Sequence, residues 1–203
     1  MNTLVIIGAR AMGREACAYA QEAGFKVKGF LDSKADALSG FDGYPEVLAS
    51  VEDYRISSED EFVCALGDPE CKQRYVDSIA ARGGRFVSIV HPTAYVGRNV
   101  KIGAGSIICP NATITNDTIL GEHVILNVGA SINHDNRIGD FSTICPGCRL
   151  AGRVTIGKYV FIGTGALIIP DVSLGDNVYV AAGATVTRSF KAGRLMGVPA
   201  IQK

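Results

Sequence analysis

The chain has 203 residues, of which 47% are hydrophobic, and its 20 Lys and Arg side chains balance 20 Asp and Glu side chains. This neutral balance argues against a nucleic acid partner. The sequence also contains no run of basic residues that would predict a membrane partner. The amino terminus, MNTLVIIGAR, has an apolar run too short for a signal peptide or a membrane span, so a cytoplasmic protein is expected. Six cysteines lie within apolar stretches, which predicts reduced, buried thiols and no disulfide framework.

The first half alternates predicted strands with predicted helices. Strands are expected over 4–8, 27–32, 61–67 and 85–90, helices over 13–24 and 70–82, and an irregular segment reaches about Ser58. Asp68 is the expected N-cap of the second helix, ahead of a proline. This alternation predicts a parallel sheet whose ligand crevice lies beyond the strand ends, at Gly8, Asp32 and Gly67.

The first strand leads into Gly8-Ala-Arg-Ala-Met-Gly13, which keeps two glycines of a dinucleotide fingerprint but has Arg10 in place of the middle one. Asp32 lies where an acceptor for ribose hydroxyls would be. The motif is weak support for a nicotinamide-dependent oxidoreductase. Two readings stay open: contact with a nucleotide-sugar, or glycines that serve only tight packing of strand against helix.

A period of six residues fills the second half. Every sixth residue from Val90 to Val186 is aliphatic, the next residue is often glycine, and the fifth residue of each unit is usually small or β-branched. A helix is excluded because its apolar spacing is three or four. Six residues of which two point inward describe a short strand and a corner, and stacked units bury a continuous aliphatic column. The pattern predicts a parallel β-helix.

This repeat, closed by Gly197-Val198-Pro199-Ala200, resembles the left-handed β-helix of the hexapeptide-repeat acyltransferases. The resemblance implies that three hexapeptides form one triangular coil, that residues eighteen apart stack, and that three chains assemble as a homotrimer. The expected architecture is an α/β, Rossmann-like domain over residues 1–89, followed by a left-handed parallel β-helix over residues 90–203.

Both halves together are similar to the sialic-acid O-acetyltransferase-like family, which includes N-acetyltransferases of UDP-4-amino-sugars. The resemblance implies that the first domain binds a nucleotide-linked amino-sugar through its strand ends. The matching residues are Arg10, Ala11, Met12, Asp32, Ser33 and Gly67. Met12 stands where some members that act on amino-sugars carry a histidine, which leaves the identity of the sugar open.

His134 and Asp135 follow an inward isoleucine and are expected at an outward corner. An imidazole can take the proton that an amine or hydroxyl loses when it attacks a thioester, and a neighbouring carboxylate can hold the tautomer. The resemblance implies that this pair is catalytic. The alternative is a solvated corner histidine bonded to its neighbours.

Acetyl-CoA is the co-substrate that the resemblance implies, in a groove between adjacent β-helices. The expected cofactor-binding residues are Thr143, Gly152, Thr164 and Ala182, with the Gly152 amide facing the thioester carbonyl. Basic side chains near the carboxyl end either meet the CoA phosphates or form a solvated tail; these are Arg188, Lys191 and Arg194.

No metal site is expected, because the three histidines do not converge on one corner of a coil. His91 is expected to be structural, and His123 to lie at the surface or in an interface. Cys145 and Cys148 are interpreted as packing residues, since no second cysteine pair exists.

The sequence therefore predicts an acetyl-CoA-dependent N-acetyltransferase of a nucleotide-linked amino-sugar, of the UDP-4-amino-sugar type, in surface-glycan biosynthesis. Two alternatives remain: an O-acetyltransferase of sialic acid or another sugar, and a non-catalytic β-helical scaffold. The acceptor, its ring position and the nucleotide carrier are left open.

Overall fold

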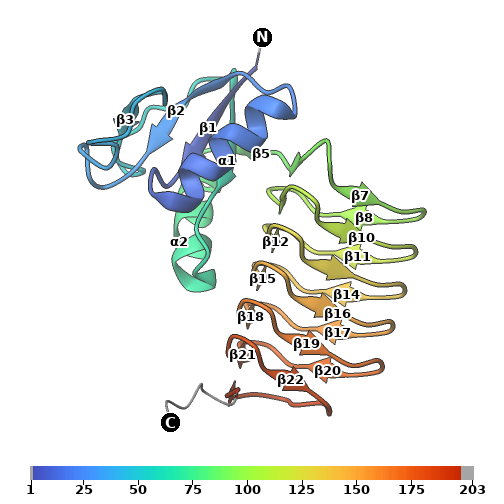
Figure 1. The fold of residues 1–203 in the computed structure, drawn as a ribbon. Helices are drawn as coiled ribbons and strands as arrows, with labels where there is room; N and C mark the ends of the chain where they lie inside the picture. Colours follow the sequence, from blue (N-terminus) through green and yellow to red (C-terminus); the bar gives the residue numbers. More distant parts are fainter. Residues whose placement is uncertain (1, 198–203) are drawn as a thin grey trace.

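The computed structural model describes residues 2–197 as an α/β domain beside the upper coils of a parallel β-helix (Figure 1). The predicted fold is confirmed at the level of these two architectures. Val198, Pro199 and Ala200 of the closing motif lie outside the described residues. Within the described part, neither helix is long and apolar enough to cross a membrane.

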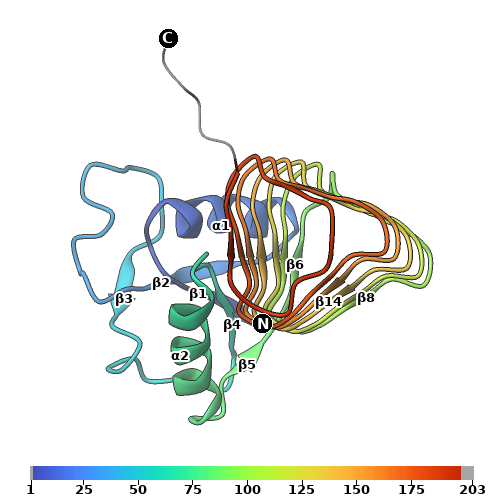
Figure 2. The same cartoon turned by 90° about the horizontal axis from the view of Figure 1, so that it is seen from below.

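The α/β domain is a parallel sheet in the order β3-β2-β1-β4-β5, with one helix on each face (Figure 2). Its elements are β1 (Thr3–Ile7), α1 (Ala11–Glu22), β2 (Val27–Leu31), β3 (Val47–Ala49), β4 (Asp60–Cys64), α2 (Pro69–Ala80) and β5 (Arg85–Phe86). Alternate residues of β1 point to opposite faces. Leu4 and Ile6 pack with the α1 side, and Val5 and Ile7 with the α2 side.

Two features of this domain differ from expectation. The strand expected over 85–90 is broken: β5 pairs with β4, whereas β6 (Ile89–Val90) pairs with a strand of the β-helix. The segment expected to be irregular contains β3, which pairs with β2. The expected cap is present, because Asp68 Oδ1 accepts the Cys71 N–H at 2.8 Å. Cys71 is exposed, so the expectation that all six thiols are buried is wrong for this residue.

The β-helix has three faces, in which each strand from β6 to β22 pairs with the strand eighteen residues away, whereas the last strand pairs at a step of fifteen residues. Face I consists of β6, β9 (Ile107–Ile108), β12 (Ile125–Leu126), β15 (Thr143–Ile144), β18 (Phe161–Ile162), β21 (Tyr179–Val180) and β23 (Arg194–Leu195). Face II consists of β7 (Tyr95–Val96), β10 (Thr113–Ile114), β13 (Ser131–Ile132), β16 (Arg149–Leu150), β19 (Leu167–Ile168) and β22 (Thr185–Val186). Face III consists of β8 (Lys101–Ile102), β11 (Ile119–Leu120), β14 (Arg137–Ile138), β17 (Thr155–Ile156) and β20 (Ser173–Leu174).

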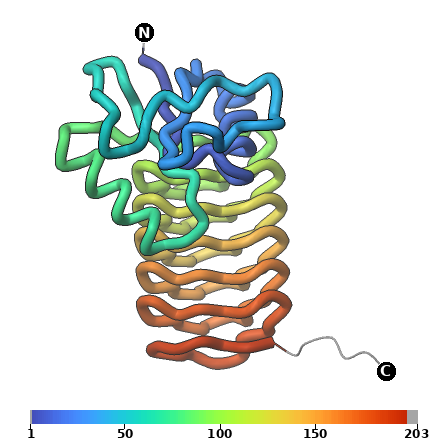
Figure 3. The backbone as a smooth tube through the Cα atoms, turned by 90° about the vertical axis from the view of Figure 1, so that its left-hand side faces the viewer, coloured from blue at the N-terminus to red at the C-terminus, as the bar shows by residue number. Residues whose placement is uncertain are grey.

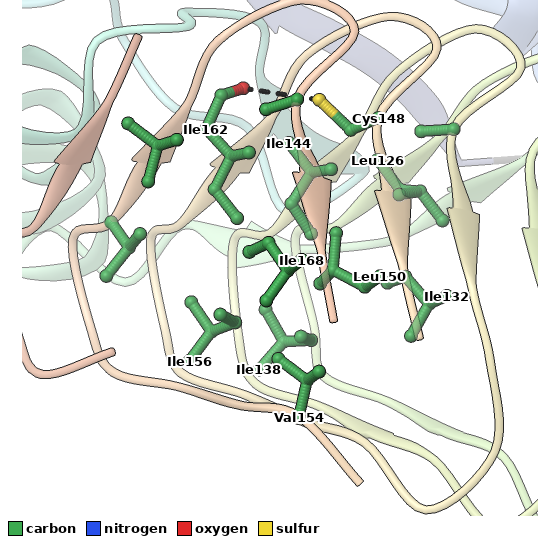
Figure 4. Close-up of a cluster of buried hydrophobic side chains, with 14 of the residues drawn as sticks. Leu126, Ile132, Ile138, Ile144, Cys148, Leu150, Val154, Ile156, Ile162 and Ile168 are labelled. Atoms are coloured by element: carbon green, nitrogen blue, oxygen red, sulfur yellow. Dashed lines mark hydrogen bonds between the residues drawn. The ribbon is translucent and has the colours of Figure 1, made fainter. Parts of the chain in front are cut away.

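The aliphatic column fills the interior of the coils (Figure 4). Its members are buried from Ile108 to Val186, whereas Val90 and Val96 remain 37% exposed in the first coil. Cys148 lies inside the column and donates to the Gly163 carbonyl at 3.1 Å, and Cys145 packs against the same core. Both cysteines are packing residues, as predicted.

The corners share one backbone conformation. The fourth residue of every hexapeptide from Asn99 to Gly183 has a positive φ, between 55° and 72°. Only five of these positions are glycine. The others include His123 and Asp135, so the coil geometry imposes a left-handed conformation on residues that rarely adopt it.

Face I is the face that the α/β domain covers (Figure 3). Outward side chains of its upper strands, Ile89, Ile107 and Ile125, share one buried cluster with Leu4 and Ile6 of β1. From α2, the fully buried Lys72 reaches into the coils, and its Nζ donates to the His123 carbonyl at 2.9 Å. The two domains therefore share a continuous buried interface within one chain.

Candidate active site

A pocket of about 300 Å³ opens at the carboxyl ends of β1, β2 and β4, where the sequence predicts the ligand crevice. All six residues expected to bind the nucleotide-sugar line it: Arg10, Ala11, Met12, Asp32, Ser33 and Gly67. These residues are neighbours, as predicted, because the carboxyl ends of parallel strands meet at one edge of the sheet.

The glycine motif shapes the floor of this pocket. A Cβ built on Gly13 would lie 1.9 Å from the Gly8 carbonyl oxygen, so only glycine lets the first turn of α1 approach the end of β1 this closely. Asp32 holds the same loop, since its Oδ2 accepts the Ala9 N–H at 3.0 Å and its Oδ1 accepts the Lys34 N–H at 3.0 Å. Asp32 is thus a structural acceptor of the pocket as well as a candidate ligand contact.

The pocket combines an apolar wall with a positive end. Arg10 is the N-cap residue of α1 and makes no side-chain capping bond, so the orphan amides of the first turn and a guanidinium meet at the pocket rim. Such an end favours phosphate groups. Val51, Leu66 and Tyr75 form part of the wall. Sequence reasoning missed Val51 and Tyr75, because no local motif marks side chains that come from a distant loop and from α2.

His134 lies on an exposed corner between β13 and β14, which we call the His134 corner. Its Nδ1 is 2.7 Å from Asp135 Oδ2, and the two side chains are 52% and 55% exposed. The carboxylate holds the ring through Nδ1 and leaves Nε2 for proton transfer. The positive φ of Asp135, 60°, turns the chain so that adjacent side chains face each other.

Gly152, one coil below, lies directly against the His134 ring. A Cβ added to Gly152 would be 2.5 Å from His134 Cε1 and 2.6 Å from Nε2. The coils are also joined by a hydrogen bond from the Arg153 N–H to the His134 carbonyl, at 3.0 Å. The stacking predicted from the eighteen-residue step is therefore present at this corner.

The other expected cofactor residues lie elsewhere. Thr164 and Ala182 are exposed at the corner between faces I and II, across face II from His134. Thr143 is only 2% exposed and its hydroxyl accepts from Lys72 Nζ at 3.1 Å. In this structure Thr143 is a contact between the two domains, which departs from its expected place in a groove.

His123 lies in an interface, which is one of the two places expected for it. It is 4% exposed and lies under the chain's own α/β domain, so the surface alternative is wrong. Its ring contacts Phe86 edge-on at 4.8 Å and stacks on Phe141 at 4.9 Å. Burial, with the nearby charge of Lys72, lowers the pKa of His123 to about 4. A histidine that stays neutral there cannot serve as the exposed base.

His91 is a packing histidine, as expected. It is buried, and its Nε2 lies 2.7 Å from Glu22 Oε2 while its Nδ1 lies 2.9 Å from the Thr93 hydroxyl. Among residues 2–197, no three His, Cys, Asp or Glu side chains gather as metal ligands would.

The pocket and the His134 corner lie on opposite sides of the β-helix. The α/β domain covers face I, and the His134 corner joins faces II and III, so it is the one corner that does not border face I (Figure 2). Within one chain, the β-helix therefore lies between the pocket and His134.

Both halves of the chain are similar to known proteins. Residues 3–79 match the family described as the PglD N-terminal domain, and residues 153–188 match the bacterial transferase hexapeptide family. Over 74 residues the chain is 34% identical to GDP-perosamine N-acetyltransferase of Escherichia coli O157:H7. That match spans 36% of this chain and 34% of the relative's length.

Two solved structures are similar over nearly the whole chain. The acetyltransferase domain of PglB from Neisseria gonorrhoeae has 27% identity and a TM-score of 0.90, over 97% of both chains. It is also known in complex with acetyl coenzyme A. PerB from Caulobacter crescentus, in complex with CoA and GDP-perosamine, has 29% identity and a TM-score of 0.89, over 100% of this chain and 98% of that one.

Proposed function

We propose that this chain, which belongs to the PglD-type family of hexapeptide-repeat acetyltransferases, transfers the acetyl group of acetyl-CoA to the amine of a nucleotide-linked amino-sugar. The observation that carries the proposal is the exposed His134–Asp135 pair, 2.7 Å apart and seated against Gly152. An exposed, oriented imidazole beside a glycine amide is what acyl transfer from a thioester requires.

In the proposed reaction, His134 Nε2 accepts a proton from the acceptor amine as its nitrogen attacks the thioester carbonyl. The Asp135 carboxylate stabilises the imidazolium that forms. The Gly152 amide donates to the oxyanion of the tetrahedral intermediate. The C–S bond then breaks, the CoA thiolate leaves and takes the proton from His134, and the amide product forms without an acyl-enzyme.

The nucleotide part of the acceptor fits the pocket of the α/β domain. The diphosphate would lie at Arg10 and the α1 amides, and the base against the apolar wall that includes Tyr75. Two relatives act on or bind GDP-perosamine, a nucleotide amino-sugar. We retain the UDP-4-amino-sugar class and a role in surface-glycan biosynthesis as proposals, to be decided by the acceptor panel below.

The working unit in this proposal is a homotrimer, in which the pocket of one chain faces His134 of a neighbour. The His134 corner is remote from face I, which the α/β domain covers, so the pocket of one chain can approach only the His134 of a neighbour. In the same proposal acetyl-CoA lies along the contact between two β-helices, next to Gly152, with Thr164 and Ala182 across face II. A cytoplasmic location remains a prediction.

The proposal is tested by following free-thiol release from acetyl-CoA with purified protein. UDP-4-amino-sugars, GDP-linked and dTDP-linked amino-sugars and sialic acid are offered separately, with a no-acceptor control for the six cysteines of the chain. We expect release with one nucleotide amino-sugar, reduced at least several-hundred-fold in His134→Ala. Because the corner is exposed, the variant should unfold at the wild-type temperature.

Other outcomes would change the assignment. Release only with sialic acid would support O-acetylation, and retained activity in His134→Ala would remove this residue from the mechanism. A protein that binds no acetyl-CoA would be a scaffold.

Mixed trimers test the shared site. Trimers that combine His134→Ala chains with chains altered in the pocket should regain part of the activity that each variant lacks by itself.

A further inference from the structure

A large polar side chain lies inside the β-helix, next to the backbone of the His134 corner. In the column at the His134 corner, the inward fifth residue of the hexapeptide in successive coils is Val100, Thr118, Asn136, Val154 and Val172. Asn136 is fully buried among these mostly aliphatic neighbours. A carboxamide in such a place is costly unless all its hydrogen-bonding capacity is used.

All the polar atoms of the Asn136 side chain have partners. Nδ2 donates to the carbonyls of Asn133 at 2.7 Å, His134 at 3.2 Å and Ala151 at 2.9 Å. Oδ1 accepts the Val154 N–H at 3.0 Å. Because three acceptors surround the nitrogen and a donor faces the oxygen, the orientation of the amide is determined.

Ser142, one hexapeptide later, shows which of these bonds belong to the fold. Its hydroxyl donates to the Gly157 carbonyl at 2.9 Å and accepts the Val160 N–H at 3.1 Å. These are the residues fifteen and eighteen positions ahead, as Ala151 and Val154 are for Asn136. A hydroxyl has a single hydrogen, so it can make the bonds to the next coil but not the two additional bonds back to its own corner.

We propose that Asn136 is a positioning residue for the acetyl transfer, which clamps the backbone of the His134 corner to the coil that carries Gly152. This inference rests on the proposed role of His134 as the base. One amide group holds the carbonyls of Asn133 and His134 on one coil and of Ala151 on the next. It therefore sets the base relative to the amide beside it, where an error of about 1 Å can cost on the order of 100-fold in rate.

The informative variant is Asn136→Thr. Thr118, in the same column, shows that a threonine there makes the bonds to the next coil, because its hydroxyl donates to the Asn133 carbonyl at 3.0 Å and accepts the Asn136 N–H at 3.4 Å. Its one contact with its own corner is with the carbonyl two residues back, that of Asn116, at 3.4 Å. The substitution thus removes the bond to the Asn133 carbonyl and weakens the bond to the His134 carbonyl. Asn136→Val, which repeats the valine found at Val154, is the second variant. Ser142→Ala is the matched control, because it removes interior bonds at a corner remote from His134.

We expect Asn136→Thr to lower kcat about 10- to 100-fold with KM for both substrates within about twofold, and Ser142→Ala to keep kcat within about twofold. A readout independent of activity is the ring resonance of His134 in NMR spectra, which the three histidines of the chain make simple to assign. It should shift or broaden in Asn136→Thr and Asn136→Val but not in Ser142→Ala.

Unchanged kcat and an unchanged His134 resonance in the Asn136 variants would overturn the inference, as would a loss of kcat that Ser142→Ala shares. The His134→Ala variant separates the two proposals. If His134→Ala is active, the proposed function fails. If His134→Ala is inactive while Asn136→Thr is fully active, only the positioning role fails.

Discussion

His123 and His134 lie on two corners of the same β-helix, eleven residues apart in a uniform repeat, yet their environments are opposite. The His123 ring is enclosed by Phe86 and Phe141, and burial keeps it neutral, with a pKa of about 4. The His134 ring is half exposed and paired with a carboxylate. The repeat supplies both corners, and what covers each corner decides its chemistry.

The α/β domain covers His123, and the contact between this domain and the β-helix includes a buried lysine. Lys72 donates to the His123 carbonyl and to the Thr143 hydroxyl, and burial lowers its pKa from 10.5 to about 7. Within residues 2–197, no such cover reaches the His134 corner, which borders faces II and III. The exposed histidine therefore lies at a corner that the α/β domain leaves uncovered.

Among the variants that test this difference between the His123 and His134 corners, Gly152→Ala should have the largest effect. The added methyl would occupy space now held by the His134 ring, 2.5 Å from Cε1, so the ring must turn away and kcat should fall about 100-fold. Stability should change little, because an exposed side chain can move. The measurements are steady-state kinetics and the unfolding temperature.

Gly139→Ala is the matched control for that clash. Its Cβ would lie 2.5 Å from the Gly157 carbonyl carbon, and backbone cannot move aside as a ring can. This variant should lose stability, whereas Gly152→Ala loses activity. Wild-type kcat in Gly152→Ala would show that the ring position beside Gly152 does not matter.

Asp135→Asn should have a smaller effect, about tenfold on kcat, because the pair is half exposed and water can stabilise part of the imidazolium charge that a buried triad leaves to its carboxylate. The variant removes the charge that stabilises the His134 imidazolium but keeps a residue that tolerates the positive φ of 60°. Asp117→Asn, eighteen residues earlier at the same corner and with φ 58°, controls for general loss of negative charge. Equal losses in both variants would contradict a specific role for Asp135.

Lys72→Met tests the covered side through stability. The unfolded chain keeps the Lys72 proton up to about pH 10.5 and the folded chain releases it near pH 7, so between these values the unfolded state binds more protons. The contribution of Lys72 to the free energy of unfolding should therefore rise with pH in this window, by at most about 1.4 kcal/mol per pH unit. Buried thiols with raised pKa values contribute with the opposite sign, equally in both proteins. The difference in unfolding free energy between the wild type and Lys72→Met, measured in urea, should therefore shift in favour of the wild type between pH 7 and 9.5.

His123→Phe should give the smallest effect, because its pH window is narrower. The unfolded chain protonates His123 near pH 6.5 and the folded chain only near pH 4, so unfolding free energy should fall as pH is lowered between these values. Phenylalanine already occupies the equivalent corner position at Phe141, with φ 60°. The variant should keep more of its stability at pH 4.5, measured by urea unfolding; an equal acid loss would place the sensitive group elsewhere.

Local patterns predicted much of this molecule. The six-residue period specified the coils and the inward column, since a side chain every sixth residue can be buried only if the coils stack. The strand ends predicted where the pocket lies, because parallel strands bring their carboxyl ends to one edge, and all six residues that the family resemblance added there line it. The family resemblance singled out His134 and Asp135 as a pair, and only the structure shows that their side chains are in contact.

What lay beyond the sequence depended on contacts between distant segments. The burial of His123 and Thr143 requires α2 to dock on face I, and no sequence pattern near either residue predicts this docking. The importance of Asn136 emerges only when the coils above and below supply its four partners. Periodicity is a local property that repeats identically at every coil, so it cannot say which coil another domain will cover. Tertiary packing determines which coil is covered, and therefore which histidine is buried and which is exposed.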